Sequence, residues 1–386
     1  MNELSPSEAA KLARDIYLAQ DPSTLAIFLA RKDFCVNKKN KVHLKAEVGT
    51  RLINTKDGFG VCAIGGDTNK NQIFLIFRGT TMANYKADVF TDARIGIERS
   101  DAGLPVHIGF NHAFSSMREE IKNFLGQHSN TTGTVHCIGH SLGGAVATLA
   151  ADWVARNRIN PVKLYTFGSP RVGTDWFTQA LTRKLKASSI NRVFHETDPV
   201  TMIPLYPFVH APNPGSSYFL PSSLPLTSGD AHKMKNYVKS VNEKSWKQIK
   251  EVDKSPYTLE MAIENWLKSK TPVDSSSAKF WQWADAALIY VLKKIMIGSA
   301  ITLQSCFVGA FTLADKIAYI LAKGIDLTSS VSIWIYHLMR KLMQALGMKI
   351  AKDVKDLTRA IMQTVLARIL EKMTQNAHNA IRKIVE

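Results

Sequence analysis

The sequence predicts an α/β protein with a mostly parallel central sheet, followed by an all-α C-terminal region. Three observations support this prediction. Short apolar runs alternate with helical patterns along much of the chain, each run is stopped near a glycine, proline or aspartate, and strand signals disappear beyond about residue 250. Alternating strands and helices favour a parallel sheet with helices on both of its faces.

Four apolar runs are typical of short buried strands. They are residues 72–77, 134–138, 163–167 and 191–195. The patterns before and between them are helical, and they cover residues 6–19, 113–125, 144–154 and 175–185. In the first helix, Ser5 suits the N-cap and Pro6 suits the first helical position.

Size and composition predict more than one structural unit. The chain has 386 residues, and 45% of them are hydrophobic, which is enough for a sizeable core and excludes disorder of the whole chain. Composition changes after a stretch with proline and a serine run. We predict a first domain over residues 1–254, a linker over residues 255–277 and a helical region over residues 278–386.

The formal net charge of +17 favours anionic partners, either nucleic acid or an acidic lipid surface. The sequence has no zinc-finger spacing, no glycine-rich phosphate loop and no aromatic RNA-binding signature, so we expect no nucleic acid partner. A basic, well-solvated surface without a specific partner is the alternative.

Cysteine usage and the N-terminus bear on localisation. The cysteines stand at positions 35, 62, 137 and 306 without a C-x-x-C pair, which predicts free thiols and folding in a reducing compartment. The N-terminus lacks a basic segment followed by an apolar stretch, so we predict no signal peptide. We expect a cytoplasmic or membrane-associated protein, or one exported by a route other than general secretion.

Residues 139–143 read Gly-His-Ser-Leu-Gly, a Gly-x-Ser-x-Gly pattern. The pattern follows an apolar strand and opens an alanine-rich helix, which is the setting that a catalytic serine on a sharp strand-to-helix turn requires. The flanking glycines allow a sharp turn, and the helix N-terminus favours developing negative charge. A glycine-rich turn with an incidental serine is the alternative. We interpret Ser141 as the nucleophile of a serine esterase.

A serine nucleophile needs a base and a carboxylate that orients the base. In this architecture the chain order is serine, then acid, then histidine. Asp198 follows the fourth strand, so its position suits the acid, although aspartate before proline also forms Asx turns. His195 precedes Asp198 and breaks the order. His210 and His232 both follow it, and the order alone leaves both open.

Several blocks, in this order, make residues from about 70 to 240 resemble the class 3 lipases, the family of the fungal triacylglycerol lipases. Residues 78–80 resemble its Arg-Gly-Ser/Thr turn, and residues 106–110 resemble its Val-His-x-Gly-Phe block. Residues 167–173 resemble its Phe-Gly-x-Pro-Arg-Val-Gly block, and residues 198–204 resemble its aspartate segment. The resemblance implies an α/β-hydrolase fold and hydrolysis of lipid esters.

The resemblance also assigns roles to residues of the site. It favours His232 as the base, because residues 208–210 match a non-catalytic histidine of the family and residues 231–237 loosely match the catalytic stretch. It assigns Thr80 to the oxyanion hole. Leu142, which follows the nucleophile, gives its backbone N–H there in any such turn.

A lid over residues 81–97 is a further implication of the resemblance. Met82, Tyr85, Val89 and Phe90 lie there roughly at helical spacing. An amphipathic lid covers the site in water and opens where its apolar face meets lipid. An ordinary surface helix is the alternative, and Tyr85 stands where the family usually has tryptophan.

The resemblance does not cover residues 275–386, which carry 15 Lys and Arg against 7 Asp and Glu. Residues 295–314 contain no charge and are long enough to cross a bilayer, but they include several polar side chains. From residue 350 onward the pattern is that of an amphipathic basic helix. A soluble bundle packed on the hydrolase, a membrane-inserting or membrane-lying module and a docking module for a protein partner are the three alternatives.

These observations predict a carboxylic ester hydrolase that acts on lipid, of the phospholipase A type, on membrane phospholipids with an anionic surface. The proposed chemistry requires no metal or cofactor. A triacylglycerol lipase and a soluble esterase are alternatives. A non-enzymatic lipase-like scaffold that binds partners through its C-terminal helices is the alternative of another class. A secreted antibacterial effector with an inhibitory or delivery protein as partner is a further hypothesis.

Overall fold

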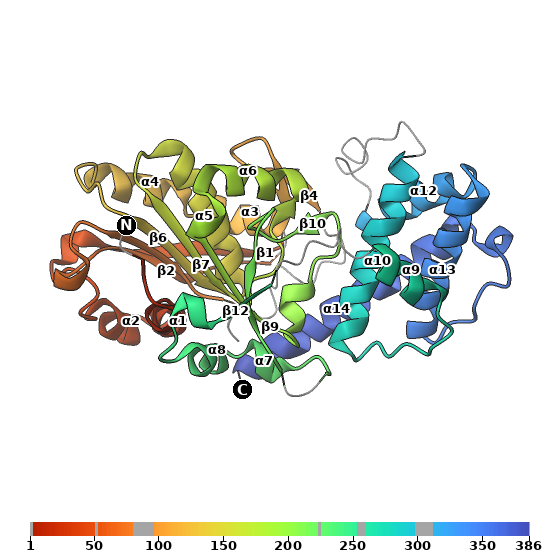
Figure 1. Cartoon of the computed structure of the whole chain (residues 1–386). Helices are drawn as coiled ribbons and strands as arrows, with labels where there is room; N and C mark the ends of the chain where they lie inside the picture. The colour runs from red at the N-terminus through yellow and green to blue at the C-terminus, as the bar shows by residue number, and fades with distance from the viewer. Residues whose placement is uncertain are drawn as a thin grey trace.

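An eight-stranded sheet forms the centre of the first part of the chain (Figure 1). The computed structural model describes residues 3–50, 53–79, 96–222, 225–252, 260–297 and 312–385. The strand order is β1-β2-β3-β6-β7-β9-β11-β12. The strands are β1 Lys41–Thr50, β2 Ile53–Ile64, β3 Ile73–Phe77, β6 Val135–His140, β7 Val162–Phe167, β9 Ile190–His195, β11 Ser217–Leu220 and β12 Lys250–Val252.

The sheet is mostly parallel, as predicted. Strands β3, β6, β7, β9 and β11 run parallel, whereas β1, β2 and β12 pair antiparallel with their neighbours. A smaller antiparallel sheet has the order β10-β8-β5-β4 and lies beside it. Its strands are β4 Ile97–Arg99, β5 Pro105–His107, β8 Gly173–Thr174 and β10 Phe208–Val209. The architecture is that of an α/β-hydrolase.

Helices cover both faces of the large sheet because its central strands are apolar on both sides. In β3, Leu75 and Phe77 belong to one apolar cluster, whereas Phe74 and Ile76 belong to the other, since strand side chains alternate between the faces. The helices are α1 Pro6–Asp15, α2 Pro22–Leu29, α3 Ile108–Ser115, α4 Arg118–Gln127, α5 Leu142–Asn157, α6 Asp175–Leu185, α7 Gly229–His232 and α8 Met234–Val241, with short 3₁₀ turns including η1 Ile16–Gln20 and η6 Pro199–Met202.

The predicted helices differ from the observed ones mainly at their ends. The helix expected over residues 113–125 is two helices, because α3 starts at Ile108 and ends at Ser115 before α4 begins at Arg118. The first helix ends at Asp15 and continues as the 3₁₀ turn η1. Its start is as predicted, since Ser5 and Glu8 form a capping box.

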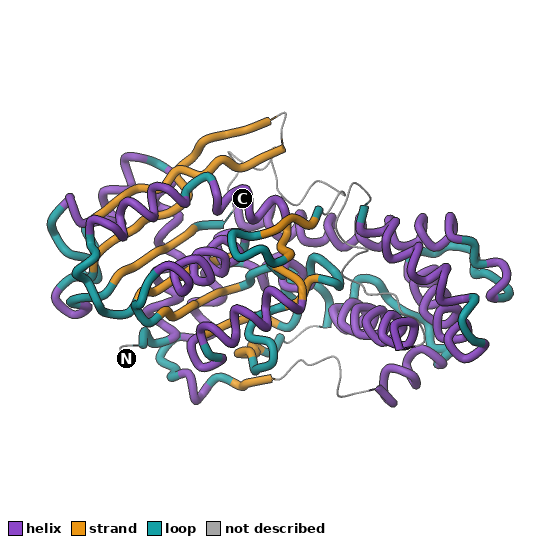
Figure 2. Tube along the Cα trace, turned by 90° about the horizontal axis from the view of Figure 1, so that it is seen from above, coloured by secondary structure: helices purple, strands orange, loops and turns teal. Residues whose placement is uncertain are grey.

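The C-terminal region is helical, as predicted. It contains α9 Glu260–Lys268, α10 Ala278–Ile297, α12 Leu313–Ile325, α13 Ser329–Ala345 and α14 Arg359–Val385. Helix α9 falls inside the predicted linker and packs against α10 and α13 (Figure 1). Figure 2 shows a group of helices without strands on one side of the part that contains the strands. In the ranges given above, none of the helices is long and apolar enough to cross a membrane. Most of the charge-free stretch 295–314, including Cys306, lies outside the described residues.

A buried ion pair joins the helical region to the first domain. Asp285 of α10 accepts from the Arg171 guanidinium at 2.9 Å, and its other oxygen accepts from the backbone N–H of Tyr206 at 3.1 Å. Both charged side chains are mostly buried. Helix α10 is therefore fixed directly to two loops at the edge of the first domain.

We expect Asp285→Ala to lower the free energy of unfolding by about 3–5 kcal/mol, because it leaves the buried Arg171 cation without its partner. Urea denaturation followed by circular dichroism measures this change. Asp326→Ala, which removes an exposed aspartate at the end of α12, should change the free energy of unfolding by less than about 0.5 kcal/mol. A cost for Asp285→Ala as small as that of Asp326→Ala would show that the ion pair does not anchor α10.

Candidate active site

Ser141 occupies a sharp turn between β6 and α5. Its backbone angles are φ 55° and ψ −129°, a strained combination for a residue with a side chain. The turn is so tight that a Cβ at Gly139 would lie 2.1 Å from the Gly143 carbonyl oxygen, and one at Gly143 would lie 2.3 Å from the Phe77 carbonyl oxygen. Glycine at both positions is thus a steric requirement, which explains the Gly-x-Ser-x-Gly spacing.

Ser141, His232 and Asp198 form one hydrogen-bonded chain. The Ser141 Oγ lies 2.8 Å from His232 Nε2, and His232 Nδ1 lies 2.8 Å from Asp198 Oδ2. All three residues are buried. With Asp198 ionised, Nδ1–H donates to the carboxylate and Nε2 is left to accept the serine proton. This arrangement is the one that general-base activation of a serine requires.

Asp198 is held as a carboxylate by its local structure. It caps η6, so its Oδ1 accepts from the backbone N–H of Val200 at 2.9 Å, while its Oδ2 also accepts from the Tyr237 hydroxyl at 2.7 Å. Burial acts to raise the pKa of Asp198, but His232, Tyr237 and the Val200 N–H together hold that pKa below its ordinary value. The acid therefore stays charged next to the imidazole.

Gly168, which follows β7, allows the acid and the base to meet. Its φ is +56°, and a Cβ there would lie 2.8 Å from Asp198 Oδ2 and 3.0 Å from His232 Nδ1. A larger residue would enter the space that the Asp198–His232 hydrogen bond occupies. Glycine at the end of β7 thus leaves room for the Asp198 and His232 side chains.

A second buried chain of hydrogen bonds ties the turns around Ser141 together. The Gly79 backbone N–H donates to the Tyr17 hydroxyl at 3.1 Å, and this hydroxyl lies 2.7 Å from His140 Nδ1. His140 Nε2 lies 2.8 Å from the backbone carbonyl oxygen of His232. Burial, followed by the nearby His232, lowers the pKa of His140 to about 3, so His140 is neutral. It accepts from Tyr17 and donates to His232.

The remaining histidines near Asp198 have structural partners instead of Ser141. His195 Nδ1 lies 2.7 Å from the Ala231 carbonyl oxygen, and its Nε2 lies 2.9 Å from Ser240 Oγ. His210 Nε2 lies 2.7 Å from the Thr201 carbonyl oxygen. The structure therefore brings His232, rather than His195 or His210, to the serine.

Of the two residues predicted to form an oxyanion hole, Leu142 lies in the described part of the chain. Leu142 is the first residue of α5, so its backbone N–H has no partner within the helix. Thr80 and the lid residues Met82, Tyr85, Val89 and Phe90 lie outside the described residues, so their roles stay predictions. Arg78, just before them, is buried and donates to the Gly58 and Gly79 carbonyl oxygens at 2.5 and 2.8 Å. It thereby holds the backbone of Gly79, the residue before Thr80.

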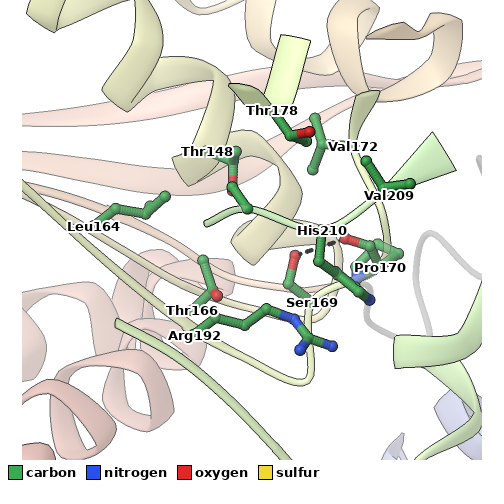
Figure 3. Close-up of a pocket in the computed structure, with 11 residues that line it drawn as sticks. Thr148, Leu164, Thr166, Ser169, Pro170, Val172, Thr178, Arg192, Val209 and His210 are labelled. Atoms are coloured by element: carbon green, nitrogen blue, oxygen red, sulfur yellow. Dashed lines mark hydrogen bonds between the residues drawn. The ribbon is translucent and has the colours of Figure 1, made fainter. Parts of the chain in front are cut away.

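A small pocket lies between β7, β9 and helices α5 and α6 (Figure 3). Arg192 lines it together with Thr166, Ser169 and His210, and the Nε of Arg192 is buried without a hydrogen-bond partner. Burial, with a smaller contribution from Arg171, lowers the pKa of Arg192 to about 9. Ser141, His232 and Asp198 do not line this pocket, so it is separate from the candidate site.

Two tyrosines that the sequence did not predict also support the site: Tyr17 of the N-terminal η1 and Tyr237 of α8. Tyr17 contacts His140 across 123 positions of the chain, and no local pattern marks it. The only signal for Tyr237 is its place five residues after His232 in the stretch that resembles the family's catalytic histidine segment.

Residues 74–208 match the model of the family described as Lipase (class 3). A secreted mono- and diacylglycerol lipase of Fusarium solani is 35% identical over 158 residues, which are 40% of this chain and 45% of that protein. The phospholipase A(1) DAD1 of Arabidopsis thaliana is 32% identical over 115 residues, which are 27% of this chain and 25% of that protein. The chain therefore spans less than half the length of these relatives.

Solved structures of fungal lipases also match. The triacylglyceride lipase of Rhizomucor miehei is 24% identical with a TM-score of 0.40, and the match covers 56% of this chain and 82% of that protein. A further fungal lipase is 22% identical with a TM-score of 0.42, and the match covers 64% of this chain and 84% of that protein.

Proposed function

We propose that this chain hydrolyses carboxylic esters of lipids with Ser141 as the nucleophile, on the premise that residues 74–208 match the class 3 lipase family. The observation that carries the proposal is the hydrogen-bonded chain from Ser141 through His232 to Asp198. A scaffold without activity has no need to keep these three side chains aligned and buried.

The proposed reaction follows from the positions of these groups. Ser141 Oγ attacks the acyl carbonyl while His232 Nε2 takes the hydroxyl proton, and Asp198 stabilises the imidazolium that forms. The Leu142 N–H, with Thr80 as the predicted second donor, stabilises the oxyanion. His232 then gives its proton to the leaving alcohol. In the second half of the reaction, His232 takes a proton from water as the water oxygen attacks the acyl-enzyme, and it returns that proton to Ser141. The products are a fatty acid and an alcohol.

We further propose membrane phospholipid as the substrate, with cleavage of the phospholipase A type. The net charge of +17 favours an anionic lipid surface over neutral fat. One of the relatives is named a phospholipase A(1), whereas others are named mono- and diacylglycerol lipases. The antibacterial effector predicted from the sequence would act by this same hydrolysis, and it stays a prediction.

We expect vesicles that contain phosphatidylglycerol to release fatty acid and lysophospholipid faster than emulsions of diacylglycerol or triacylglycerol do. A gain of about tenfold corresponds to only 1.4 kcal/mol of preferential interaction with the anionic surface. Product analysis by mass spectrometry measures both substrates with the same enzyme preparation. High salt should reduce the preference, because it screens the charges.

Three outcomes separate the alternatives. Faster release of fatty acid from the emulsions would indicate an acylglycerol lipase instead of a phospholipase. Cleavage of short soluble esters without release of fatty acid from either lipid would indicate an esterase for other substrates. No hydrolysis and no labelling by a fluorophosphonate would leave the scaffold as the better explanation.

A further inference from the structure

Helix α14 extends from the C-terminal helices to the catalytic domain (Figure 1). In its first half, the Gln363 side chain bonds to Asp315 of α12, and the Lys372 ammonium donates to the Ala345 carbonyl oxygen at the end of α13. Beyond Lys372, the helix still buries one side. The buried residues of this second half are Met373, Ala377, Ala380 and Ile381, which we name the α14 stripe.

Among the described residues outside the helical region, α14 packs mainly against α7 and η6. Helix α7 ends at His232, and η6 begins directly after Asp198. The α14 stripe belongs to the same apolar cluster as Val200 and Met202 of η6. The small alanines of the stripe allow the helix to approach closely. Helix α14 therefore lies on the two elements that carry the base and the acid of the site.

The catalytic site is closed in this arrangement. Ser141 exposes 1% of its surface, and His232 and Asp198 expose none. An ester carbonyl must come within about 3–3.5 Å of Ser141 Oγ to react. A buried nucleophile that acts on lipid therefore requires at least one covering element to move.

The second half of α14 has the composition of a helix that binds anionic lipid. Residues 373–385 contain two cationic residues, Arg382 and Lys383, and no Asp or Glu. Of the residues around the stripe, Gln375, Asn379 and Arg382 are exposed. An apolar stripe opposite a polar, cationic face is the pattern of helices that lie in the surface of a bilayer.

We propose that the α14 stripe is a lipid-binding surface that is stored against η6 and α7 in water. On an anionic bilayer, residues 373–385 detach from η6 and α7 and bind lipid instead. This movement opens the catalytic site. The inference rests on the proposed function, because it assigns Ser141 as the residue that becomes accessible. It adds the C-terminal helix as the element that couples lipid binding to access.

The rate of Ser141 labelling by a water-soluble fluorophosphonate tests this coupling in the full-length protein. For the wild type, we expect phosphatidylglycerol vesicles to raise the rate and phosphatidylcholine vesicles to leave it nearly unchanged. Ala377→Glu should label about tenfold faster than the wild type without lipid, because a carboxylate in the apolar interface shifts the equilibrium to the open form. Asn379→Glu is the matched control, since it adds the same charge on the exposed side of α14.

Equal labelling rates for Ala377→Glu, Asn379→Glu and the wild type would overturn the proposal. A slower rate for a folded Ala377→Glu would also overturn it, because α14 would then position His232 instead of covering Ser141. The comparison of the two vesicle types in the wild type keeps the proposal testable if Ala377→Glu does not fold.

Hydrogen exchange separates a failure of this proposal from a failure of the proposed function. Phosphatidylglycerol vesicles should speed the exchange of backbone amides in η6 and α7, which lose their cover, whether or not Ser141 reacts. Faster exchange without any labelling would contradict the role of Ser141 and support the movement of α14. Unchanged exchange together with rapid labelling would contradict the movement and support the role of Ser141.

Discussion

Ser141→Ala is expected to lower kcat for ester hydrolysis on the order of 10⁶-fold, the largest effect that we predict for any single substitution in this chain. The alanine removes the oxygen that forms the acyl-enzyme, and the oxyanion donors and substrate binding account for the activity that remains. The fold should not change, because alanine keeps the Cβ and the turn has the same strained backbone in both proteins. Steady-state hydrolysis of a soluble p-nitrophenyl ester measures the loss.

Ser169→Ala provides a matched control for this substitution. Ser169 is a buried serine close to the start of α5, and its hydroxyl donates to the Pro170 carbonyl oxygen at 3.1 Å instead of contacting His232. We expect its removal to change kcat by no more than a few-fold. If Ser141→Ala kept activity within this range as well, the nucleophile would have to be another group.

The strand–turn–helix around Ser141 could be predicted from sequence because its physical requirements are local. A buried strand, two glycines that avoid backbone clashes and a helix start all fall within a few residues of the serine. Asp198 could be predicted for the same reason, since it follows a buried strand at the end of the sheet. The parallel sheet follows from the alternation of strands and helices.

The support of the site depends on contacts that no local pattern encodes. The hydrogen bond between Tyr17 and His140 spans 123 positions, and the bond between Tyr237 and Asp198 spans 39. The packing of α14 on η6 and α7 joins residues that are even further apart in the chain. The amphipathic spacing predicted that one face of α14 is buried, but it did not distinguish a lipid surface from a protein surface as the partner of that face.

The choice of His232 shows where family resemblance contributed more than physics. Chain order left His210 and His232 open, and the resemblance favoured His232 although residues 231–237 match the family only loosely. The structure places His232 at the C-terminus of the short helix α7, within 2.8 Å of both Ser141 and Asp198. His210 instead lies against the backbone of η6.

Acid is expected to destabilise this protein steeply below about pH 6.5, because folding buries several histidines in the neutral form. Burial lowers the pKa values of His107, His136 and His140 to about 3 each, with Lys163 as a smaller cause for His136 and His232 as a smaller cause for His140. The unfolded chain binds a proton at each of them near pH 6.5. A lowered pKa in the folded state stabilises the fold above the unfolded pKa, and this contribution is lost as pH falls toward 3.

Three such groups predict a slope of about 4 kcal/mol per pH unit near pH 5, since each proton contributes about 1.4 kcal/mol per unit. Urea denaturation at pH 7, 6 and 5 measures this slope. His136→Gln should reduce it by about one third, because one buried histidine no longer titrates on unfolding. Gln127→Ala, at an exposed position without a titratable group, should leave it unchanged. A slope that is the same in all three proteins would mean that His136 takes up its proton in the folded state. Water or a local rearrangement would then have to reach His136 in the sheet interior, where the rings of Phe74 and Tyr165 stack on it.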